Sequence, residues 1–129
     1  MEEVAGRLPS NHYLDLVRAL PRRHAGLLMQ LRTGHIPLQA YLARIGKALS
    51  RTCPTCGEAP ETVHHYLIEC PTYNLHRAVH FAKLGRAGRT LRKLLATEDA
   101  LRPLFRFVNA TGRFCQVFGA LDNVPRQEG

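Results

Sequence analysis

The chain has 129 residues, of which 45% are hydrophobic and 22% charged, and 18 Lys and Arg against 10 Asp and Glu give a net charge of +8. This length allows one domain with a modest core, and the positive charge favours nucleic acids or anionic surfaces as partners. No apolar run approaches the roughly 18 to 20 residues that span a bilayer, and the acidic start Met1–Val4 lacks the pattern of a signal peptide. We therefore expect an intracellular protein, nuclear or cytoplasmic, with no membrane partner.

A first helical arm is predicted over residues 10–46, after a start at 1–9 that we expect to be disordered. Ser10 or Asn11 can cap a helix that ends at Pro21, a second helix runs from there to Gly34, and a third short helix ends at Gly46. Mostly apolar residues recur in each helix at the spacing of one face: Tyr13, Leu14, Val17 and Leu20; Leu27, Leu28 and Leu31 together with His24; Leu38, Tyr41, Leu42 and Ile45.

A second helical arm is predicted over residues 72–118, and a disordered tail over 119–129. Thr90 can cap its middle helix, Pro103 predicts a break or restart in the next one, and Gly112 ends that helix. Cys115 is interpreted as a core cysteine of a short closing segment. The residues expected to face the core are Leu75, Ala78, Val79 and Ala82, then Leu91, Leu94 and Leu95, then Leu101, Leu104, Phe105 and Val108.

The segment 50–71 between the arms holds three of the four cysteines and two adjacent histidines. Cys53 and Cys56 stand in the motif Cys-Pro-Thr-Cys-Gly, whose proline stiffens the turn and whose glycine can take a positive φ. With Cys70 and either His64 or His65 they have the spacing of a closed structural zinc site.

Only one of the two histidines can bind such a metal ion. Thr62 is expected to cap a short helix that begins before them, and adjacent helical residues point about 100° apart. The spacing alone does not choose between His64 and His65. A redox Cys-x-x-Cys pair is disfavoured because it needs a βαβ context, and chance burial because the cysteines cluster beside histidines. We therefore predict a mostly α-helical single domain over residues 10–118, with one zinc knuckle between two helical arms.

Two stretches without acidic residues, 16–57 and 71–97, flank the metal segment. Their basic side chains are candidates for phosphate contact, because the planar fork of Arg binds phosphate bidentately, although solvated helix faces would give a similar pattern. The candidate nucleic-acid-binding residues are Arg22, Arg23, Arg32, Arg44, Lys47, Arg51, Arg89, Arg92 and Lys93.

Five stretches together resemble the C-terminal tail of non-LTR (LINE-type) retrotransposon polyproteins of the fungal type, which follows their reverse transcriptase and RNase H domains. These stretches are Leu20–Ala25, Leu31–Leu38, Cys53–Gly57, Glu61–Pro71 and Asn109–Phe114. The resemblance implies a Cys-Cys-His-Cys zinc site formed by Cys53, Cys56, His65 and Cys70, and binding of RNA or DNA during reverse transcription.

The same resemblance sets limits on activity. The polymerase and RNase H of such elements need clustered carboxylates for Mg²⁺, whereas Asp15, Asp99 and Asp122 lie far apart here. We therefore expect a non-catalytic fragment. The alternatives are a zinc-stapled module that docks on the reverse transcriptase and RNase H domains or on a host partner, and a remnant of the element without function.

Overall fold

The computed structural model describes residues 17–86 and 89–119, and its regular secondary structure is helical, as predicted. Within these ranges there is no strand, only an isolated antiparallel bridge between Thr52 and Pro60. The helices are α2 (Arg22–Thr33), α3 (Gln39–Arg44), the π-helical η2 (His65–Glu69), the 3₁₀ turns η3 (Pro71–Tyr73) and η4 (Ala82–Leu84), α4 (Asn74–His80), α5 (Leu91–Ala96), α6 (Glu98–Thr111) and α7 (Cys115–Phe118).

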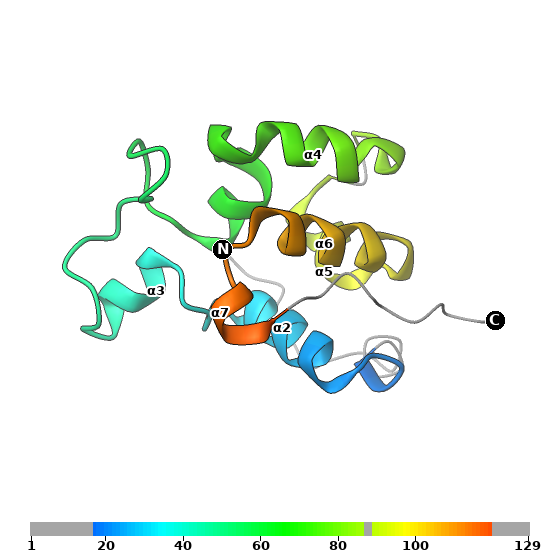
Figure 1. The fold of residues 1–129 in the computed structure, drawn as a ribbon, viewed down its shortest axis with the longest axis horizontal. Coiled ribbons are helices and arrows are strands. Elements are labelled where there is room, and N and C mark those ends of the chain that lie inside the picture. The colour runs from blue at the N-terminus through cyan, green and yellow to red at the C-terminus, as the bar shows by residue number, and fades with distance from the viewer. Residues whose placement is uncertain (1–16, 87–88, 120–129) are drawn as a thin grey trace.

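Helix α6 forms the centre of the domain. It packs against α4 on one side and α5 on the other, and α5 in turn contacts α2 (Figure 1). The long segment that carries the metal motif extends away from this bundle beside α3 (Figure 1). Leu101, Leu104, Phe105 and Val108 of α6 are all buried, so the predicted core stripe is confirmed.

The first arm agrees with the prediction in its middle part. Pro21 precedes α2, Gly34 ends it with φ +81°, and His24, Leu27, Leu28 and Leu31 are buried. Most of the helix expected after Ser10 or Asn11 lies outside the described residues. The expected burial of Ile45 is wrong, because α3 ends at Arg44 and leaves that side chain 45% exposed.

Helix α4 is turned differently from the prediction. Leu75 and Val79, expected in the core, are 74% and 62% exposed, and Tyr73, Arg77 and Phe81 are buried instead. The physical reason is the buried guanidinium of Arg77, which donates to the backbone carbonyls of Tyr66, Leu67 and Cys70, in and just after η2. These hydrogen bonds stabilise the observed orientation of α4 more than burial of Leu75 and Val79 would stabilise the opposite one.

Two further expectations about the second arm are wrong. Helix α6 runs without a break through Pro103, and the chain restarts at Thr97 instead. Because Pro103 lies in the second turn, it deprives only the Asp99 carbonyl of an amide partner, and Asp99 is an exposed residue. Cys115 is exposed, and Phe114 and Phe118 beside it fill the core.

Candidate metal centre

A tight double turn presents the first two cysteines. The Cys53 amide donates to the Ala59 carbonyl at 2.8 Å, and the Glu61 amide donates to the Arg51 carbonyl at 2.8 Å, so the two ends of the loop run side by side. Between them the Gly57 amide donates to the Cys53 carbonyl at 2.9 Å, with Gly57 at φ +68°. The glycine after Cys56 therefore takes the positive φ that the motif predicts.

A short π-helix presents the other two side chains. Thr62 caps, as predicted, the helical turn that begins at Val63 and leads into this π-helix, with Oγ1 accepting from the His65 amide at 3.0 Å. The Cys70 amide donates to the His65 carbonyl at 2.7 Å, an i to i+5 bond. This bond closes one wide helical turn, so residues that are five apart in the chain lie on the same face of the helix. The His-x4-Cys spacing thus brings His65 and Cys70 together.

The structure brings Cys53, Cys56, His65 and Cys70 into one cluster, with one ligand atom of each within 4.8 Å of the others. Cys53 Sγ and Cys70 Sγ lie 3.8 Å apart, and Cys56 Sγ lies 3.3 Å from His65 Nε2. A tetrahedral zinc ion with Zn–S of about 2.3 Å and Zn–N of about 2.0 Å would require an S–S edge of about 3.8 Å and an S–N edge of about 3.5 Å. The four donor atoms are therefore grouped closely enough for a single metal ion to bind all of them.

The two histidines have different positions. His65 is buried at 4% exposure within the cluster, whereas the exposed side chain of His64 directs Nδ1 to Glu69 Oε2 at 3.3 Å. The buried Nδ1 of His65 has no hydrogen-bond partner, and Glu69 Oε1 is 3.7 Å away. When Nε2 binds a metal, Nδ1 carries the proton, and Glu69 is placed to orient the ring through it.

Hydrogen bonds favour the thiolate form of two of the three cysteines, Cys53 and Cys70. Burial raises the pKa of Cys53, but hydrogen bonds from the Thr55 hydroxyl and from the amides of Cys56 and Thr55 have the larger combined effect. The pKa of Cys53 is therefore below its ordinary value. Burial likewise raises the pKa of Cys70, and the side chains of Thr55 and Thr72 more than offset this. The Glu58 amide lowers the pKa of Cys56, but burial and the neighbouring thiols raise it more. A divalent cation would remove this repulsion among the sulfurs.

Arg77, which the sequence analysis did not single out, holds the second half of the cluster from behind. Its Nη1 donates to the Cys70 carbonyl at 2.7 Å, its Nε to the Leu67 carbonyl at 2.8 Å and its Nη2 to the Tyr66 carbonyl at 3.0 Å. The Tyr66 and Leu67 carbonyls lie in η2, near the helix end where backbone carbonyls lack intrahelical amide partners, and the Cys70 carbonyl just after it also accepts from the Tyr73 amide at 3.2 Å. A basic residue seven positions after the last ligand is too common a pattern to have revealed this role.

Glu61 also has a structural role that its position in the sequence does not reveal. The carboxylate is fully buried and accepts two bonds from Arg113, each of 2.8 Å, and a third from the Gln39 amide at 2.8 Å. Glu61 lies just before the helix that carries His65. Its carboxylate therefore connects that helix to Arg113, which follows α6, and to Gln39 at the start of α3. The negative charge of Glu61 is therefore neutralised inside the domain by Arg113.

The nine predicted nucleic-acid-binding side chains lie on several elements of the structure. Arg23, Arg32 and Arg89 donate to the carbonyls of Phe118, Leu95 and Phe81, respectively, and so also support the fold. Arg22 of α2, Lys47 of the loop after α3, and Arg92 and Lys93 of α5 are exposed. The structure brings three of the nine, Arg32, Arg44 and Arg51, to the lining of one groove.

Comparison of the chain with protein-family models, with curated proteins and with solved structures finds no match. Among the described residues, no helix has both the length and the apolar character needed to cross a membrane.

Proposed function

We propose that this chain is a non-catalytic module that binds one structural zinc ion and uses the stapled fold to bind RNA or DNA. The four-residue cluster carries the metal part of this proposal. Three cysteines and one histidine within 4.8 Å of one another are a donor set that structural zinc prefers, and four protein donors leave no open position for a substrate.

The proposed nucleic-acid function is supported by charge. The net charge is +8, and the exposed candidate side chains include Arg22, Arg44, Lys47, Arg51, Arg92 and Lys93. The resemblance to retrotransposon tails adds a partner class, the element's RNA or target DNA. In that interpretation the zinc site orders the segment 50–71, and catalysis belongs to other domains of the polyprotein.

Two measurements test the proposal. Metal analysis of the purified protein should give one zinc per chain, and Cys70→Ser should lose both the zinc and cooperative unfolding. Binding to labelled RNA should weaken steeply between low and physiological salt, because each phosphate contact releases counterions. Absence of binding at low salt would reject the nucleic-acid function and leave the metal assignment standing.

A protein-docking module is the second candidate, and the exposed apolar face of α4 favours it. Leu75 and Val79 lie one helical turn apart, and both point into solvent. The double variant Leu75→Ser/Val79→Ser should abolish binding to isolated reverse transcriptase and RNase H domains if docking is the function. The same variant should leave RNA affinity unchanged if our first proposal holds.

A further inference from the structure

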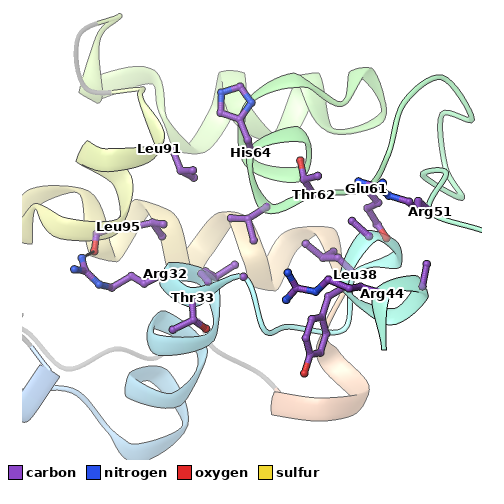
Figure 2. Close-up of a pocket in the computed structure, with 16 residues that line it drawn as sticks. Arg32, Thr33, Leu38, Arg44, Arg51, Glu61, Thr62, His64, Leu91 and Leu95 are labelled. Atoms are coloured by element: carbon purple, nitrogen blue, oxygen red, sulfur yellow. Dashed lines mark hydrogen bonds between the residues drawn. The ribbon is translucent and has the colours of Figure 1, made fainter. Parts of the chain in front are cut away.

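A groove of about 740 Å³ lies between the C-terminal end of α2, helix α3, the segment 61–64 and helix α5 (Figure 2). Its floor is apolar and includes Leu31, Leu38, Val63 and Leu95. This volume is within the range of about 300 to 1,000 Å³ that is typical of small-molecule sites. The groove can therefore accept a group of small-molecule size that has an apolar face.

The rim of the groove is positively charged. Arg32 lies beside Leu95 at one end, and Arg44 and Arg51 lie toward the other end with Glu61 (Figure 2). Glu61 is the acidic residue among the described lining residues, and its charge is paired with Arg113. Arg44 and Arg51 are exposed. An anionic group at this end of the groove would meet the positive charges of Arg44 and Arg51.

Aromatic rings also lie at the rim. Tyr41, which lines the groove, stacks on His35 with 5.1 Å between ring centroids and 23° between planes. Arg44 Cζ lies 5.5 Å from the centre of the Tyr41 ring. Tyrosine and arginine planes beside a cationic rim are the two elements on which bases of single strands stack.

We propose that this groove binds one unpaired nucleotide of a single-stranded nucleic acid, with its base on the apolar floor beside Tyr41 and its flanking phosphates on Arg44 and Arg51. This inference rests on the proposed nucleic-acid function and adds a preference for single strands. A base within a duplex is stacked and paired, so it cannot enter the groove without being extruded. A duplex can therefore contact the rim of the groove only through its phosphates.

The phosphate contacts are tested with a fluorescein-labelled 12-residue oligouridine at a series of salt concentrations. Arg44→Gln/Arg51→Gln should weaken binding about tenfold or more at low salt and reduce the salt slope by about 1.4, since each single-strand phosphate contact contributes about 0.7. The matched control is Lys83→Gln/Arg106→Gln, which removes two exposed charges outside the groove lining. Equal effects of the two double variants would overturn the inference.

The base contact is tested with a strand of equal length and charge whose residues are abasic. It should bind roughly tenfold more weakly than oligouridine to the natural protein. Ala43→Phe, which adds a ring to the groove lining without changing charge, should abolish this difference. Zinc content and far-UV circular dichroism confirm that each variant is folded.

The outcomes separate the two proposals. If no strand binds at low salt, the proposed nucleic-acid function and the groove inference both fail. If all strands bind but intact, abasic and duplex forms are equal, only the groove inference fails. Displacement of oligouridine by an acidic amphipathic peptide, combined with that equality, would assign the groove to a protein partner instead.

Discussion

The guanidinium group of Arg77 lies against the backbone of Cys70, with 2.7 Å between Nη1 and the carbonyl oxygen. The same group binds the carbonyls of Leu67 and Tyr66, so one buried side chain holds the turn that places both His65 and Cys70. The positively charged Arg77 thus supports a cluster whose sulfurs become negatively charged, and this arrangement is electrostatically favourable.

Replacing Arg77 should damage both the fold and the metal site. Arg77→Met keeps much of the side-chain volume but leaves buried carbonyls without donors, at an expected cost of about 3 kcal/mol in the free energy of unfolding. Urea denaturation of the zinc-loaded protein measures this, with Arg106→Met on the exposed face of α6 as the control. A loss below about 0.5 kcal/mol, as expected for an ordinary surface change, would contradict the structural role.

The two adjacent histidines should differ sharply in a metal assay. His65→Ala removes the only nitrogen donor of the cluster and should abolish stoichiometric zinc, whereas His64→Ala should retain one zinc per chain. Substitution by Co²⁺ gives a second readout, because its visible spectrum reports the number of sulfur and nitrogen ligands. The reverse pattern would show that His64 is the ligand.

Acidification should release the metal. The ligands bind as thiolates and neutral imidazole, so protons compete with zinc, and the apparent affinity should fall as the pH decreases from 8 toward 5. Since bound zinc lowers the thiol pKa in the folded state alone, its stabilisation is present at high pH and is lost as the pH falls. Thermal unfolding across this range should show the loss for loaded protein, and chelator-treated protein should lack it.

The buried pair of Glu61 and Arg113 should behave as a unit. Arg113→Met leaves the buried Glu61 carboxylate uncompensated and should cost about 3 to 5 kcal/mol in the free energy of unfolding. Adding Glu61→Gln should recover part of this loss, because the second change removes the unpaired charge. A double-mutant cycle measures the coupling, and additive effects of the two substitutions would refute it.

The orientation of α4 can be tested by comparing its two faces. Val79→Ser, on the exposed face, should change the free energy of unfolding by no more than about 0.5 kcal/mol. Phe81→Ala, two residues later and fully buried against Phe107, should cost about 3 to 5 kcal/mol. Comparable losses would support the face that sequence periodicity predicted.

Local patterns in the sequence were sufficient for the features that depend on neighbouring residues. The stops at Gly34 and Gly112, the caps at Thr62 and Thr90 and the buried stripe of α6 all follow from backbone conformation or helical spacing, and the structure has them. The Cys-x2-Cys and His-x4-Cys spacings likewise predicted which side chains could meet. Choosing His65 over His64 at the sequence level required the resemblance.

Tertiary structure alone decided the features that depend on partners distant in the chain. Arg77 displaces the apolar face of α4 because its donors meet carbonyls from another element, and Pro103 is tolerated because α6 begins early enough to place it in the second turn. The exposure of Cys115 and the burial of Glu61 beside Arg113 have the same origin. Residue type and spacing predict what a side chain can bind, whereas only packing determines which partner is within reach.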